Sequence, residues 1–123
     1  MPRNCSAHDY SALIRKWRAL SKKTPLRVGK VSTPKSLPFF EVTNGLLSRE
    51  KPCLYISAGI HGDEPAPCWA LLEWAEKNHG LLQDFPVLFY PCLNPWGFVH
   101  NSRLDEYGED LNRIWGNEHH PLT

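Results

Sequence analysis

The chain has 123 residues, of which 41% are hydrophobic and 22% are charged, a composition typical of one soluble globular domain rather than a disordered segment. Its formal net charge of +1 argues against a protein that binds nucleic acid or a membrane surface, which would carry a basic excess. No apolar run approaches the ~20 residues that span a bilayer, and the N-terminus lacks the apolar core of a secretory signal, so we expect a cytoplasmic protein.

The first third of the chain predicts a helix followed by a connector. Apolar residues recur there at three- and four-residue steps, which indicates an amphipathic helix over residues 8–21. These residues are Tyr10, Leu13, Ile14, Trp17 and Leu20. Residues 22–38 contain three prolines and many lysines, so we expect a solvated connector with a short strand near residues 26–31. The stretch FFEV at 39–42, followed by TNG, predicts a strand and a turn.

The second half of the chain predicts a strand–helix–strand unit. CLYISAG at 53–59 and PVLFYPC at 86–92 are almost entirely apolar, as buried strands of an α/β sheet are. Between them, Pro65 can open a helix because the first helical N–H has no partner, and Gly80 can end it. Such a unit makes the sheet at least partly parallel. From Asn94 onward the composition predicts a long loop, and long loops in compact domains tend to be functional.

The four cysteines show no C-x-x-C spacing. They are Cys5, Cys53, Cys68 and Cys92. In a reducing compartment we expect free thiols rather than disulfides, with Cys53 and Cys92 in the cores of their strands.

A histidine and a carboxylate follow the first of these strands in the stretch HGDE at 61–64. His61 and Glu64 are three residues apart, so both side chains can converge on one point, and both are good zinc ligands. Gly59 and Gly62 allow a sharp turn beside them. The alternative is an ordinary polar turn in which Asp63 and Glu64 favour the N-terminus of a helix. The spacing alone does not decide between the two, because so short a motif also arises by chance.

A second polar segment, residues 94–113, also begins directly after a strand. If the two strands are parallel neighbours, the segment lies at the same edge of the sheet as His61. It contains Arg103 and Arg113, with Asn112 directly before the latter. Arginine in a cleft can bind a carboxylate or stabilise the oxyanion that develops as a carbonyl is attacked. The alternative is a surface loop with solvated arginines.

Together the two segments, HGDE at 61–64 and NPWGF-x4-R-x4-G-x-DLNR at 94–113, resemble the zinc carboxypeptidase superfamily, including its aspartoacylase and succinylglutamate desuccinylase branch. The resemblance implies that His61 and Glu64 are two zinc ligands. It implies that Arg103 polarises the scissile carbonyl, and that Asn112 and Arg113 bind the substrate's carboxylate. Asp110 and Gly108 would shape the loop. Asp63, next to the ligands, would help to orient them without binding zinc itself.

The resemblance also implies a partial three-layer α/β/α domain with a mixed, partly parallel sheet, formed by residues 1–123 as one domain. Members of the superfamily take a third zinc ligand, a histidine, and a catalytic glutamate from later in the chain. His119 and His120 follow Arg113 too closely to match that histidine. We therefore expect the front part of a catalytic domain, with an exposed sheet edge, an uncovered apolar face and marginal stability.

The expected function is zinc-dependent hydrolysis of an amide bond next to a free carboxylate, at a peptide C-terminus or in a cell-wall-type peptide. NPWGF and the nine-residue step from Arg103 to Asn112 favour the peptidase branch. The alternatives are an N-acyl-amino-acid deacylase with the same ligands and a non-catalytic remnant. We expect no nucleic-acid or membrane partner.

Overall fold

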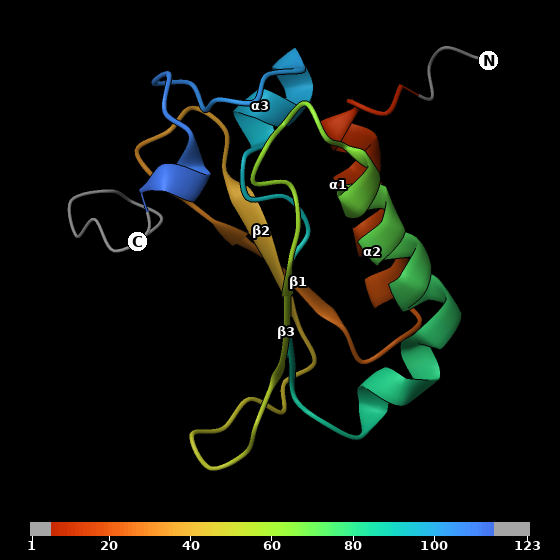
Figure 1. Ribbon diagram of the computed structural model, residues 1–123. Helices are drawn as coiled ribbons and strands as arrows, with labels where there is room; N and C mark the ends of the chain where they lie inside the picture. The colour runs from red at the N-terminus through yellow and green to blue at the C-terminus, as the bar shows by residue number, and fades with distance from the viewer. Residues whose placement is uncertain (1–5, 115–123) are drawn as a thin grey trace.

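The strands form one mixed sheet in the order β1-β2-β4-β3 (Figure 1). The computed structural model describes residues 6–114. β1 (Arg27–Val31) pairs antiparallel with β2 (Phe39–Thr43), and β2 pairs antiparallel with β4 (Val87–Tyr90). β4 runs parallel to β3 (Leu54–Ser57). The mixed, partly parallel α/β sheet predicted from the sequence is confirmed.

Two long helices pack against one face of this sheet (Figure 1). They are α1 (Tyr10–Ser21) and α2 (Ala66–Asn78), and α2 continues into the 3-10 turn η2 (His79–Gln83). The segment predicted as a long loop contains a short helix, α3 (Pro95–His100), and a 3-10 turn, η3 (Leu111–Arg113). Within residues 6–114, no helix is long and apolar enough to span a membrane.

The core lies between the two long helices and the sheet. Trp17 of α1 and Trp74 of α2 both approach Phe89 of β4, with ring centroids 6.4 and 6.3 Å apart. The side chain of Asp9 accepts a hydrogen bond from the N–H of Ala12 at 2.9 Å and caps the start of α1. The predicted periodicity of α1 is confirmed, because its buried residues are Leu13, Ile14, Trp17 and Leu20.

The opposite face of the sheet carries a row of aromatic rings. Tyr90 of β4 contacts Phe39 of β2 and Tyr55 of β3, with ring centroids 5.7 and 6.0 Å apart. Tyr55 is 52% exposed, and within the described residues β3 pairs with β4 alone. The described part of the chain therefore has the expected open sheet edge at β3, and the aromatic face beside it is exposed mainly at Tyr55.

The connector between α1 and β2 is not a purely solvated segment, and that prediction was wrong at Lys35. The Lys35 ammonium lies 2.8 Å from the Asp105 carboxylate, and the two side chains are 9% and 1% exposed. Next to this pair, the backbone N–H and the hydroxyl of Ser36 both donate to Glu106 at 2.9 Å. The connector is thereby tied to the loop that follows α3. Lysines and prolines in a segment indicate that it is exposed to solvent. That indication fails at Lys35 because a buried carboxylate from a distant part of the chain pairs with it.

The cysteines divide into one exposed and two buried thiols among those described. Cys53 is exposed, so its predicted place in a strand core was wrong. The reason is that β3 begins at Leu54, one residue later than predicted. Cys68 and Cys92 are buried and free, and burial raises the pKa of the Cys92 thiol. Cys5 lies outside the described residues.

Candidate functional site

Two loops meet at the edge of the sheet where β3 and β4 end. The backbone hydrogen bonds of this strand pair continue beyond both strands, since Ala58 donates to the carbonyl of Tyr90 at 3.0 Å and Leu93 donates to that of Ala58 at 2.9 Å. Asn94 then donates its N–H to the carbonyl of Gly59, also at 2.9 Å. The HGDE loop and the start of α3 therefore lie side by side, as expected for segments that follow two parallel strands.

Asn94 joins three parts of this region. Its side-chain oxygen accepts a hydrogen bond from the N–H of Gly97 at 3.0 Å and so caps α3. Its amide group donates to the carbonyls of Ile60 and Leu104, at 3.4 and 3.3 Å. Asn94 is buried. A single amide thus connects the HGDE loop, α3 and the arginine-bearing loop, residues 101–110, which contains Arg103.

We expect Asn94→Asp to destabilise the chain by about 2 kcal/mol, because aspartate keeps the cap but loses the donor and brings a charge close to two carbonyl oxygens. Chemical denaturation with urea measures this loss. Asn78→Asp makes the same chemical change at an exposed amide that donates to the carbonyl of Trp74 and should cost less than about 1 kcal/mol. Equal losses in the two variants would contradict the connecting role of Asn94.

The HGDE loop can approach α3 closely because Gly62 has no side chain. A Cβ atom at this position would overlap the backbone of Gly97 and Phe98. Gly59, at the start of the loop, has a φ of +75°, and a Cβ there would lie 2.7 Å from Sγ of Cys68. Glycine is therefore required at Gly62 in the motif and at Gly59 before it, because the loop packs closely on its surroundings.

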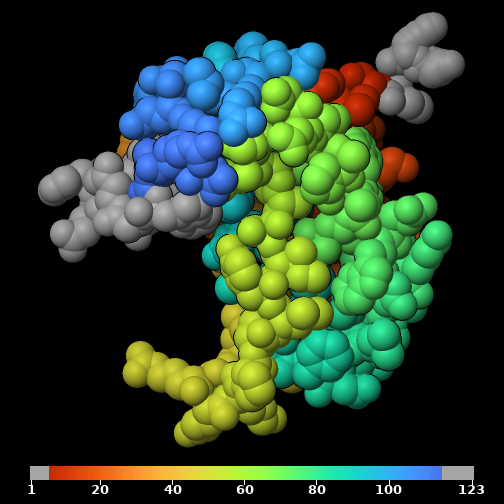
Figure 2. Space-filling view, in the orientation of Figure 1, coloured from red at the N-terminus to blue at the C-terminus, as the bar shows by residue number. Residues whose placement is uncertain are grey.

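Four side chains gather in front of this packed loop. His61 Nδ1 lies 3.4 Å from a carboxylate oxygen of Glu64, and His61 Nε2 lies 2.9 Å from Oδ1 of Asp110. Arg103 Nε donates to the other oxygen of Asp110 at 3.2 Å. The structure thus brings together His61, Glu64 and Arg103, three of the residues predicted from the sequence. Figure 2 shows the blue segment that ends at residue 114 lying against the yellow-green loop that follows β3.

Asp110 is the residue whose contribution the sequence reasoning missed. It was expected only to shape its loop, and Asp63 was expected to support the ligands. Instead Asp110 contacts the far nitrogen of His61, while Asp63 is exposed. The hydrogen bond with His61 holds the pKa of the Asp110 carboxyl below its usual range, with a further contribution from the N–H of Asn112. The signal available in the sequence was the need of a metal-binding histidine for a carboxylate on its second nitrogen.

A hollow of about 360 Å³ opens beside these side chains. Its lining includes His61, Glu64 and Asn112. Arg113 is exposed on the same 3-10 turn as Asn112 and does not line the hollow. Arg103 reaches the region through Asp110, with 46% of its side chain exposed. His119 and His120 lie outside the described residues.

The donor chemistry of His61 and Glu64 fits two ligands of a zinc ion. The Nδ1 atom of His61 and a carboxylate oxygen of Glu64 lie 3.4 Å apart, and both are groups that zinc binds. Within residues 6–114 there is no group of three or more potential metal-binding side chains. Zinc sites normally use three or four protein ligands. The described residues therefore supply two zinc-binding groups, His61 and Glu64, and the Asp110 carboxylate that contacts the second nitrogen of His61.

Comparisons with known proteins identify a family and several relatives of the chain. The family model "Succinylglutamate desuccinylase/Aspartoacylase catalytic domain" matches residues 50–122, more than half of the chain. A succinylglutamate desuccinylase of Burkholderia thailandensis is 37% identical over 79 residues, which are 62% of this chain and 22% of that protein. Cytosolic carboxypeptidase 1 of Danio rerio is 33% identical over 84 residues, which are 59% of this chain and 7% of that protein.

Solved structures share the fold as well. A protein of Shewanella denitrificans described as a candidate metallopeptidase superposes with a TM-score of 0.76 at 24% identity. The superposition covers 87% of this chain and 41% of that one. The chain spans less than a quarter of each of the two sequence relatives, so the similarity to them covers that part alone.

Proposed function

The chain belongs to the succinylglutamate desuccinylase/aspartoacylase catalytic-domain family, and from this premise we propose that it takes part in the zinc-dependent hydrolysis of an amide bond next to a free carboxylate. The observation that carries the proposal is the convergence of His61, Glu64, Asp110 and Arg103 at the end of two parallel strands. Residues 1–123 belong to one catalytic domain in this proposal. A cytoplasmic location is proposed with it, supported by the name of the carboxypeptidase relative.

His61 and Glu64 are the proposed zinc ligands, and further ligands come from outside the described residues. A zinc ion held by these residues would supply Lewis acidity that activates water near neutral pH. Asp110 accepts from His61 Nε2, which keeps the imidazole oriented with Nδ1 toward Glu64. This fixed orientation reduces the entropy lost when the ligands assemble.

Arg103 is the proposed group that stabilises the negative charge on the carbonyl oxygen as it is attacked. Its hydrogen bond to Asp110 holds the guanidinium near the hollow while leaving its terminal nitrogens for the substrate. Asn112 lines the hollow and Arg113 follows on the same turn. We assign to these two the binding of the substrate's free carboxylate, for which arginine provides a paired set of donors.

Two substrate classes fit this arrangement. The NPWGF stretch and the carboxypeptidase relative favour a peptide with a free C-terminus. The family model and the desuccinylase relative favour an N-acyl amino acid. The two classes differ in their products, because a peptidase releases an amino acid from a peptide and a deacylase releases an acyl acid such as succinate or acetate.

Zinc titration of the chain tests the metal part of the proposal. We expect one zinc per chain, bound weakly, and an affinity at least about 10-fold lower in His61→Ala and in Glu64→Ala, because each removes one of two donors. Asp110→Asn should lower the affinity by about 10-fold through the orientation of His61. Competition with a chromophoric chelator measures these affinities without requiring activity.

The titration needs two controls. Cys5 and Cys53 are replaced by serine in every variant, because thiolates are strong zinc ligands in their own right. His79→Ala removes an exposed histidine at the start of η2 and should leave the affinity within about 2-fold. Zinc binding that is unchanged in His61→Ala would refute the assigned ligands and favour a non-catalytic remnant.

A further inference from the structure

The small net charge of the chain conceals a strong separation of charge along it. Residues 10–40 carry eight of the fourteen Lys and Arg residues and none of the thirteen Asp and Glu residues. This segment comprises α1, β1 and the connector to β2. The basic side chains are therefore concentrated on one part of the fold, where they create a local positive potential that a net charge of +1 does not reveal.

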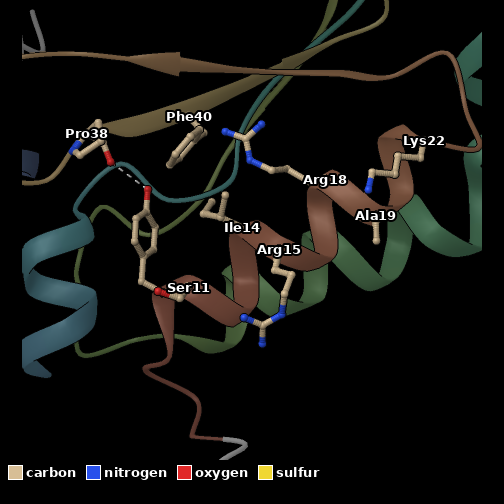
Figure 3. Close-up of a pocket in the computed structure, with 9 residues that line it drawn as sticks. Ser11, Ile14, Arg15, Arg18, Ala19, Lys22, Pro38 and Phe40 are labelled. Atoms are coloured by element: carbon tan, nitrogen blue, oxygen red, sulfur yellow. Dashed lines mark hydrogen bonds between the residues drawn. The ribbon is translucent and has the colours of Figure 1, made fainter.

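A groove runs along the exposed side of α1 within this basic segment (Figure 3). Its volume is about 580 Å³, within the range of ligand-binding pockets. Ile14 and Phe40 provide an apolar floor, and both are almost fully buried. The hydroxyl of Tyr10 donates to the carbonyl of Pro38 at 3.1 Å and joins the helix to the segment before β2.

Three cations line this groove and no carboxylate does. They are Arg15 and Arg18 of α1 and Lys22 at its C-terminal cap, and all three are exposed. None of the ion pairs among the described residues includes any of them. Arg18 reaches toward β2 (Figure 3) and lies over the ring of Phe40, 5.3 Å from its centroid. The lining thus combines unneutralised positive charge with an apolar floor.

We propose that this groove, formed by α1 and the start of β2, is a docking site for an acidic peptide segment that carries an apolar side chain. Carboxylates of the segment pair with Arg15, Arg18 and Lys22, and the apolar side chain covers Ile14 and Phe40. The groove shares no lining residue with the hollow beside His61. It is therefore a separate site, and the partner it binds is a protein segment held away from the proposed zinc ligands.

The shape and chemistry of the groove favour a peptide over the other polyanions. Single-stranded nucleic acid is bound by stacking bases on open aromatic faces, but Arg18 covers the ring of Phe40, and Tyr10 packs against Phe40 and Phe98. A membrane surface is flat, so it would contact the rim of the groove without reaching the apolar floor formed by Ile14 and Phe40. A peptide side chain can enter the groove while neighbouring carboxylates remain at the rim.

Fluorescence anisotropy with a labelled short peptide of alternating glutamate and leucine tests the proposal. The combined variant Arg15→Glu and Arg18→Glu should weaken binding at least about 10-fold, because it places like charges opposite the peptide. The matched control is Lys16→Glu with Lys23→Glu, which changes the net charge equally at positions outside the groove lining and should weaken binding less than about 3-fold. A peptide of glutamate and serine should bind at least about 5-fold more weakly than the leucine peptide, since it leaves the floor uncovered.

Circular dichroism confirms that each variant is folded, and Arg15→Gln with Arg18→Gln replaces the glutamate pair if that pair is not. Affinity should also fall as salt rises from about 0.05 to 0.15 M. Equal weakening by the groove pair and the control pair would overturn the proposal, because it would indicate a diffuse field. Absence of binding would overturn it as well. So would tighter binding of single-stranded oligothymidine or of phosphatidylserine vesicles than of the peptide.

Discussion

Gly62→Ala should destabilise the chain by about 3 kcal/mol, through overpacking alone. The Cβ atom added at this position overlaps the backbone of Gly97 and Phe98, which cannot rotate away as a side chain could. The HGDE loop must then separate from α3, and His61 moves away from Asp110 as it does so. The free energy of unfolding, measured with urea, should fall, and the affinity for zinc should fall with it.

Gly80→Ala is the matched control for this substitution. Gly80 lies in η2, and a Cβ atom there meets no heavy atom within 4 Å. Because alanine also restricts the unfolded chain more than glycine does, we expect stability within about 0.5 kcal/mol of the parent, or slightly above it. A Gly62→Ala variant as stable as Gly80→Ala would mean that the loop does not pack on α3 as described.

Asp105→Ala should lower the free energy of unfolding by a similar amount, about 3 kcal/mol, for an electrostatic reason. The substitution leaves the ammonium of Lys35, 9% exposed, without the carboxylate 2.8 Å away, and breaking a buried ion pair by removing one partner is strongly destabilising. It also removes the acceptor for the N–H groups of Tyr107 and Glu109. Urea denaturation of the variant and its parent measures the difference.

The loss of stability caused by Asp105→Ala should become smaller at acid pH. Burial alone would raise the pKa of Asp105, but the hydrogen bond from Lys35 and those from the backbone outweigh it and hold the pKa below the ordinary 3.8. A carboxyl with a lowered pKa in the folded state stabilises the fold above pH 3.8 and loses that contribution as the pH falls through its folded pKa. The difference between parent and Asp105→Ala should therefore be constant near neutrality and shrink below about pH 3.8.

The exposed ion pair on α2 is the control for this experiment. A carboxylate oxygen of Glu73 lies 3.6 Å from Nζ of Lys77, and the two side chains are 67% and 72% exposed. Glu73→Ala should change stability by less than about 0.5 kcal/mol, because water and salt screen such a pair. If Asp105→Ala cost no more than this, the contact between the connector and the arginine-bearing loop would not contribute to stability.

The sequence predicted those features whose causes lie within a few neighbouring residues. The apolar spacing of α1 depends on a helical repeat, so Leu13, Ile14, Trp17 and Leu20 could be assigned to the core from their spacing alone. The parallel pair of β3 and β4 followed from the helix between them. The nearness of His61 and Glu64 required only their three-residue separation.

Only the tertiary structure decided the contacts between residues far apart in the chain. Asp110 meets His61 across 49 residues, and Asp105 meets Lys35 across 70. Periodicity and local motifs contain no information about such pairs, because the partner is chosen by how the loops pack after the sheet has formed. The same holds for the groove on α1. Its cations were visible in the sequence, but their position beside the ring of Phe40 depends on the packing of the helix against β2.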